Sequence, residues 1–223
     1  MKSYVLSALS MESLEEMQGT LSSQHGRKLV GPLMGNLCNT DTRLRWRSIT
    51  GLGMVAEKLF QEDPEGVRWI MRRLIWMLND ESGGIGWGCG EAMGEVMARI
   101  PAIAREYHRI LVSYMDPEGN HLENPFLQRG VLWGLQRVAE LSPVYVQGLE
   151  KYLHHYLVSE DAEILAPALM LAQKIGGLDM LSLVEKRKDH AGELLFYKEG
   201  DFLGLRISEL ARETFEILKR RNS

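Results

Sequence analysis

The sequence has few of the features that mark secreted, membrane or metal-binding proteins. It contains only two cysteines, Cys38 and Cys89, with no Cys-x-x-Cys pair and no histidine at ligand spacing. Reduced thiols of a cytosolic protein are therefore expected, and not a disulfide framework or a zinc site. No stretch approaches the 18 apolar residues of a membrane helix. Acidic residues follow the short apolar run at the N-terminus, where a signal peptide has its cleavage site. We expect a cytoplasmic protein without a membrane span.

An excess of positive charge is also missing. The chain has 26 lysines and arginines against 30 aspartates and glutamates, which gives a net charge of −4. An acidic balance argues against binding to nucleic acid through bulk charge, although a local basic patch remains open.

The chain lacks a recognisable catalytic, cofactor or metal motif. The loop DPEGNHLE, which begins at Asp116, does not have the Asp-x-Asp-x-Asp-Gly pattern of a calcium loop. The adjacent His154 and His155 would point about 100° apart on a helix. Glu91 and Glu95, four residues apart, are typical of a solvated helix face. We therefore predict no catalytic residue, no cofactor and no metal site.

What the sequence does contain is a repeat of about 40 residues. The segment RWRSITGLGMVAEKL aligns with GWGCGEAMGEVMARI, so that Trp46 matches Trp87 and Gly53 matches Gly94. A third copy, GVLWGLQRVAEL, and a fourth, APALMLAQKIG, follow at similar shifts. Repeats of about this length, with two helices each, are typical of HEAT and armadillo solenoids.

Residues 27 to 176 resemble bacterial HEAT-like repeats, of the kind grouped with the phycobilisome-lyase-type HEAT family. The resemblance implies an all-α protein, an α-α superhelix of helical hairpins, and it brings no catalytic motif. We predict a single domain over 1–223. Its parts are the repeats 27–60, 63–100, 101–140 and 142–176, and a C-terminal cap over 178–223.

The helix boundaries follow from caps and prolines. The pairs Asp63-Pro64, Ile100-Pro101, Asn124-Pro125 and Ser142-Pro143 place proline at a first helical position. Before the first full repeat, we expect an amphipathic helix over Ser10–Gln24 and a short helix over Leu29–Cys38, with Pro32 in the first turn of the latter.

The end of the chain departs from the repeat. After a helix from Leu178 to about Lys188, the apolar runs 194–197 and 202–207 flank Lys-Glu-Gly-Asp, which predicts a β-hairpin. Ser208 is expected to cap a final helix. The hairpin and this helix either cover the apolar end of the solenoid or offer an edge strand to a partner.

The glycine-rich run from Gly83 to Gly90 has two interpretations. Free backbone N–H groups at a helix start could hold an anion. Alternatively, the glycines allow a tight turn and close helix contact, which is the interpretation that we favour. The run is not a Walker motif, because no Gly-Lys-Ser/Thr follows it.

Two sets of residues are candidates for binding. In helical register, Trp87 and Glu91 lie opposite the apolar stripe of their helix, where a HEAT stack has its concave surface. The predicted groove residues are Trp46, Arg43, Arg47, Trp87, Glu91 and Arg129. Tryptophan and arginine are frequent in binding hot spots. Alternatively, each tryptophan packs against the adjoining repeat.

The second set is Trp69 and Trp76, which are seven residues apart and lie nearly opposite the core stripe of their own helix. An apolar outer face indicates a protein partner, a homodimer contact or cover by a terminal element.

The sequence thus predicts a helical-repeat scaffold or adaptor that binds a protein segment in its concave groove. One alternative is a nucleic-acid enzyme resembling the HEAT-fold DNA alkyl-base glycosylases. The acidic charge and the lack of a groove-facing aspartate count against it. A second alternative, a lyase or chaperone-like factor for a tetrapyrrole protein, follows from the family resemblance alone.

Overall fold

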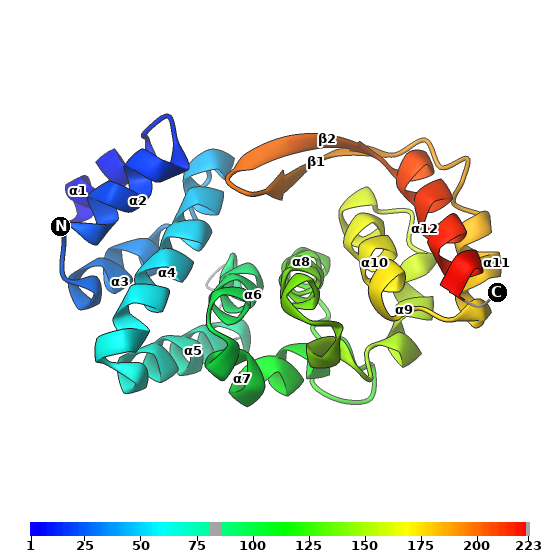
Figure 1. Ribbon diagram of the computed structural model, residues 1–223, viewed down its shortest axis with the longest axis horizontal. Coiled ribbons are helices and arrows are strands. Elements are labelled where there is room, and N and C mark those ends of the chain that lie inside the picture. The colour runs from blue at the N-terminus through cyan, green and yellow to red at the C-terminus, as the bar shows by residue number, and fades with distance from the viewer. Residues whose placement is uncertain (81–85, 222–223) are drawn as a thin grey trace. The chain divides into compact units, whose positions relative to one another are not determined.

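The computed structural model describes residues 1–80 and 86–221 as helices joined by short connections, with one β-hairpin near the C-terminus (Figure 1). The chain divides into two compact units, Met1–Tyr107 and His108–Ser223. The predicted all-α repeat architecture, with its hairpin and final helix, is confirmed.

The first unit is built from helical pairs. Its helices are α1 (Lys2–Leu9), α2 (Leu14–Ser22), α3 (Gly26–Gly35), α4 (Thr42–Glu62), α5 (Pro64–Leu78) and α6 (Cys89–Arg99), followed by the first part of α7 (Pro101–Ser113). The long helix α4 packs against α3, α5 and α6. Apolar side chains of α5 form the buried face of the helix, with Val67, Ile70, Met71 and Leu74 all fully buried.

Capping residues and prolines start these helices as the sequence predicts. The Asp63 side chain accepts a hydrogen bond of 3.0 Å from the Gly66 N–H, and Pro64 begins α5. Such a cap satisfies one of the unpaired N–H groups of a first turn and is worth about 1 kcal/mol. Ser13 and Glu16 form a reciprocal capping box at the start of α2.

Four local details differ from the sequence prediction. The N-terminal residues form α1, which the pattern did not reveal because the helix has only eight residues. Pro32 lies inside α3 and not in its first turn. The helix tolerates it because the carbonyl that loses its N–H partner belongs to Lys28, an exposed residue that water can reach. The helix expected from 178 is divided into η3 (Leu178–Met180) and α11 (Leu181–Glu185), and α12 (Ile207–Arg221) already includes Ser208.

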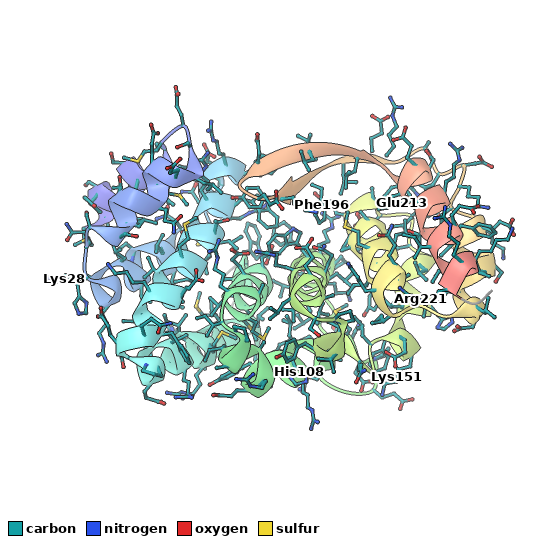
Figure 2. The ribbon with its side chains drawn as sticks, viewed as in Figure 1. Lys28, His108, Lys151, Phe196, Glu213 and Arg221 are labelled. Atoms are coloured by element: carbon teal, nitrogen blue, oxygen red, sulfur yellow. The ribbon has the colours of Figure 1, made fainter. Side chains whose placement is uncertain are left out.

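The second unit continues with α8 (Pro125–Leu141), the short η2 (Pro143–Val146), α9 (Glu150–Leu157) and α10 (Ala162–Ile175). Helix α10 packs against α8, α9 and α12. Arg221, labelled in Figure 2, donates hydrogen bonds to the carbonyls of Gln173 and Lys174 near the end of α10. Because these carbonyls have no partner within the helix, the arginine both caps α10 and fixes the end of α12.

The hairpin consists of β1 (Glu193–Lys198) and β2 (Asp201–Arg206), paired antiparallel in a continuous register from Glu193↔Arg206 to Lys198↔Asp201. Glu199 and Gly200 form the turn with positive φ values of 50° and 91°. Positive φ values at both turn residues are typical of the two-residue hairpin turns whose twist matches that of the flanking strands. The hairpin is held to α8 by the Trp133 indole, whose Nε1–H donates to the Tyr197 carbonyl at 3.0 Å.

Candidate functional site

Arg47 does not offer its guanidinium to a ligand. It lies on α4 with 4% of its surface exposed, and it donates to the Met11 carbonyl at 2.6 Å and to the Glu12 carbonyl at 2.9 Å. These hydrogen bonds tie the connection between α1 and α2 to α4. On the same helix, Arg43 is exposed and Trp46 is half-buried.

The α6 side of the predicted groove is also enclosed. Trp87 is half-buried just before the helix, and Glu91 is only 6% exposed. Helices α4 and α6 approach each other closely at Gly53, where an added Cβ would stand 2.7 Å from the Glu95 Cγ. Glu95 in turn accepts a hydrogen bond of 2.6 Å from Arg99. Periodicity alone placed Glu91 on an open face, since it does not report how closely a neighbouring helix approaches.

Arg129 belongs to the second unit, where it begins an ion-pair network with the start of α10. Its guanidinium donates to the Asp161 carboxylate at 2.6 and 2.9 Å, and also to Glu163. The predicted groove therefore draws on residues of both units, and the grouping stays a prediction. Residues 83–85 of the glycine-rich run lie outside the described residues, so its anion-binding interpretation also stays a prediction.

The outer face of α5 carries the most exposed aromatic surface among the described residues. Trp69 is 53% exposed and Trp76 is 49% exposed. Arg72 and Arg73 lie between them, so that positions 69, 72, 73 and 76 follow one face of the helix. We call these four residues the α5 stripe. The guanidinium of Arg73 lies 4.2 Å from the Trp76 ring centre, within the range of a cation–π contact.

A cavity of about 480 Å³ opens beside Trp69. It lies between the start of α3, the end of α4 and the first half of α5. Its lining residues are Arg27, Val30, Leu59, Glu65, Gly66, Trp69, Ile70 and Arg72. The apolar residues Val30, Leu59 and Ile70 are buried, whereas the charged residues are exposed and form the rim. Pockets of roughly 300–1,000 Å³ with apolar walls and a few polar groups are common binding sites.

Ion pairs position the charged groups around this cavity. Arg27 pairs with Asp63, and Arg72 donates to Glu65 at 2.6 Å. Arg68 contacts Glu106 with two hydrogen bonds of 2.7 and 2.8 Å. This hydrogen-bonded pairing lowers the pKa of the Glu106 carboxyl from its ordinary value. Because Arg72 and Glu65 are both more than half exposed, their pair is an exchangeable surface contact.

The two tryptophans of the α5 stripe were predicted from the sequence, whereas the arginines and the cavity were not. The spacing Trp-x-x-Arg-Arg-x-x-Trp is visible in the sequence and places all four residues on one face. The cavity was not predictable, because it depends on how α3 and α4 meet α5.

The two cysteines differ in their environments. Cys38 is exposed and Cys89 is fully buried at the start of α6. Burial raises the pKa of the Cys89 thiol well above its ordinary value, so the reactive thiolate is suppressed. Within residues 1–80 and 86–221, no group of three or more potential metal-binding side chains comes together.

We expect a maleimide reagent at pH 7.5 to label one thiol per native chain, at Cys38, and two thiols in denaturant. Mass spectrometry of the labelled peptides measures this directly. Rapid labelling of Cys89 in the native protein would contradict the buried environment, and Cys38→Ser provides the control in which native labelling disappears.

Comparisons with known proteins support the fold. No family model matches the chain. An uncharacterised protein from Archaeoglobus fulgidus is 25% identical over 181 residues, covering 81% of this chain and 92% of that protein. No helix in the described part of the chain is long and apolar enough to cross a membrane.

Solved helical-repeat structures superpose along nearly the whole chain. A designed armadillo repeat protein matches with a TM-score of 0.52 at 16% identity, covering 97% of this chain and 99% of the other. A second designed armadillo protein, in complex with the peptide (KR)4, matches with a TM-score of 0.50 at 15% identity, covering 97% and 98%. The chain therefore has the helical-repeat fold seen in designed armadillo proteins.

Proposed function

We propose that this protein is a non-catalytic adaptor that binds an acidic protein segment along the α5 stripe. The observation that carries the proposal is the exposure of Trp69 and Trp76 on a helix whose opposite face is already the core. An exposed aromatic pair of this kind marks an interaction surface more often than an isolated surface leucine does. Tryptophan and arginine are also the residues most enriched in binding hot spots.

The charge of α5 selects the partner. The helix carries three arginines, Arg68, Arg72 and Arg73, against the single carboxylate of Glu65. Arg68 is held by Glu106, but Arg72 can exchange the exposed Glu65 for a carboxylate of the partner. Arginine binds carboxylates through two parallel hydrogen bonds, which adds geometric specificity. An acidic segment with one apolar side chain for the cavity beside Trp69 fits both features.

The fold is compatible with this role. The designed armadillo neighbour was solved with (KR)4, a basic peptide. Here the arginines lie on the protein, so the complementary ligand is acidic. The concave-groove prediction assigns the same adaptor function to a different surface, the predicted groove. We favour the α5 stripe because Arg47 and Arg129, two of the groove arginines, are held by internal contacts.

A peptide library tests the proposal without a known partner. Random peptides displayed on phage are selected on the immobilised protein, and the enriched peptides are synthesised and titrated by fluorescence anisotropy. We expect them to be rich in aspartate and glutamate with an apolar residue. The double variant Trp69→Ala/Trp76→Ala should weaken their binding by at least about thirtyfold, because the loss of even one hot-spot tryptophan costs about 2 kcal/mol.

The matched controls lie on exposed surface of the second unit. Val144→Ala removes a side chain that is 52% exposed, and its affinity should equal that of the wild type. Arg72→Glu should abolish binding of acidic peptides, whereas Arg212→Glu, at a site 58% exposed, should not. Enriched peptides that are basic, or that bind the double tryptophan variant with unchanged affinity, would refute the proposal.

A further inference from the structure

The hairpin leaves one strand edge open. Strands β1 and β2 form a two-stranded sheet, and the Ile207 N–H donates to the Gly192 carbonyl at 3.0 Å, which fixes the hydrogen-bonding phase of the ladder. In this phase the backbone N–H and C=O groups of residues 202, 204 and 206 point away from β1. The corresponding edge of β1 is contacted by α8, where Trp133 donates to the Tyr197 carbonyl. The outer edge of β2 is therefore the one available for pairing, although the Phe202 N–H donates to the exposed Asp201 carboxylate at 2.8 Å and must exchange this acceptor for a strand carbonyl.

The middle of this edge lacks the usual protection against another strand. Natural edge strands carry proline, charged side chains, lysine above all, or a bulge. Strand β2, with the sequence DFLGLR, contains neither proline nor lysine, its charges lie only at its two ends, and its register with β1 is uninterrupted. Leu203 is 47% exposed. Gly204 is exposed, and a Cβ added there would meet nothing within 4 Å.

The strand is complementary to itself. We propose that β2 pairs antiparallel with β2 of a second copy of this chain, with Gly204 opposite the partner's Gly204. Leu203 then faces the partner's Leu205, and Phe202 faces the partner's Arg206. Leucine pairs at the non-hydrogen-bonded positions of such a ladder have their side chains in close contact.

The hairpin register extends this match across four strands. Leu194 lies opposite Leu205, and Phe196, labelled on β1 in Figure 2, lies opposite Leu203. Directly opposed residues point to the same face of a sheet. The proposed dimer therefore forms a continuous apolar row from Leu194 through Leu205 to the partner's Leu203 and the partner's Phe196, and its two-fold symmetry repeats the row.

Other antiparallel registers are poorer, which is why the second copy pairs about Gly204. The outward-facing residues 202, 204 and 206 must pair with one another, which allows two-fold centres at each residue from 202 to 206. A centre at Arg206 places two arginines opposite each other, and like charges directly opposite destabilise a ladder. A centre at Phe202 places Leu205 opposite Glu199 in the turn. A centre at Leu203 places Leu205 opposite Asp201, and a centre at Leu205 places Leu203 opposite Ile207, where α12 already begins. The Gly204 centre is the register that gives two Leu203–Leu205 pairs.

Cross-linking tests the geometry directly. Residues of a hydrogen-bonded antiparallel pair have Cα atoms about 5.5 Å apart, within the range of a disulfide. In a Cys38→Ser background, Gly204→Cys is expected to form a covalent dimer of twice 25.3 kDa under mild oxidation. Leu195→Cys, on a residue that is 70% exposed on β1, is the matched control and should remain a monomer.

Light scattering over a concentration series tests the association itself. Two short strands bury little area, so we expect a dimer that forms in the micromolar to millimolar range and not a permanent one. Leu203→Lys should return the protein to the monomer, whereas Leu195→Lys should not. Gly204→Pro should also return the protein to the monomer, since proline removes an outward N–H that β1 does not use.

The outcomes separate this proposal from the proposed function, on which it does not depend. A wild-type monomer at about 1 mM, or equal cross-linking of the Gly204→Cys and Leu195→Cys variants, overturns it. A dimer that persists in natively folded Leu203→Lys also overturns it. If the dimer persists in Leu203→Lys but is lost in Trp69→Ala/Trp76→Ala, its contact lies on the α5 stripe.

Discussion

Gly88→Ala is expected to destabilise the protein by about 3 kcal/mol or more, because two costs act at one position. Gly88 caps α6 with φ of 74° and ψ of −4°, a left-handed conformation that costs a residue with a side chain about 1–2 kcal/mol. In addition, an alanine Cβ would stand 2.7 Å from the Leu37 carbonyl oxygen and 3.0 Å from the Leu37 Cβ. A backbone carbonyl cannot move aside as a flexible side chain can, so the connection between α3 and α4 must shift.

Urea unfolding measures this effect, and Gly19→Ala is its matched control. Gly19 lies inside α2, and an added Cβ there meets nothing within 4 Å. The control should be stabilised by up to about 1 kcal/mol, because alanine has the higher helix propensity. Opposite signs for the two substitutions are the expected result. Equal effects would show that Gly88 has no special conformational role.

Cys89 provides a second readout of the same variant. It follows Gly88 directly and is fully buried, so its labelling by a maleimide reports the opening of this region. When the opened region closes again faster than the maleimide reacts with the thiol, the labelling rate follows the population of the open form. We therefore expect Gly88→Ala to accelerate Cys89 labelling, whereas Gly19→Ala leaves it slow.

The sequence predicts the architecture well because its signals are local. The helix starts at Pro64 and Pro125 depend on a capping side chain next to a proline that needs no N–H partner. The hairpin depends on a turn that only residues tolerating positive φ can form, at Glu199 and Gly200. These features need no information about distant parts of the chain.

The candidate site is less predictable because it depends on packing between helices. The apolar stripe of α6, opposite Trp87 and Glu91 in the helical register, consists of Cys89, Ala92, Met93 and Val96, and all four are buried in the core. The same periodicity could not show that Glu91 is buried as well, since a helix in the middle of a stack can be covered on more than one side. The exposure of Trp69 and Trp76 was predictable, because the other apolar residues of α5 lie on the opposite face of the helix and form the core there.

Arg47 shows how a residue suited to binding can serve a structural role instead. Its side chain is almost fully buried, and it hydrogen-bonds two consecutive backbone carbonyls, those of Met11 and Glu12. Buried carbonyls must be satisfied within the protein, and hydrogen bonds from a charged donor contribute about 1.5–3 kcal/mol each. The guanidinium satisfies both carbonyls at once, which a lysine ammonium matches less well.

Arg47→Met is therefore expected to lower the free energy of unfolding by about 2–4 kcal/mol, since methionine preserves much of the packing volume but leaves both carbonyls without their donors. Arg47→Lys should have an intermediate effect. Arg43→Met, at an exposed position four residues earlier on α4, is the matched control and should change stability by less than about 0.5 kcal/mol. Hydrogen exchange should show the largest loss of protection in α1 and α2, because Arg47 attaches their connection to α4. If Arg47→Met retains wild-type stability but loses binding of the selected peptides, the arginine acts in recognition, and the concave-groove prediction gains support over the α5 stripe.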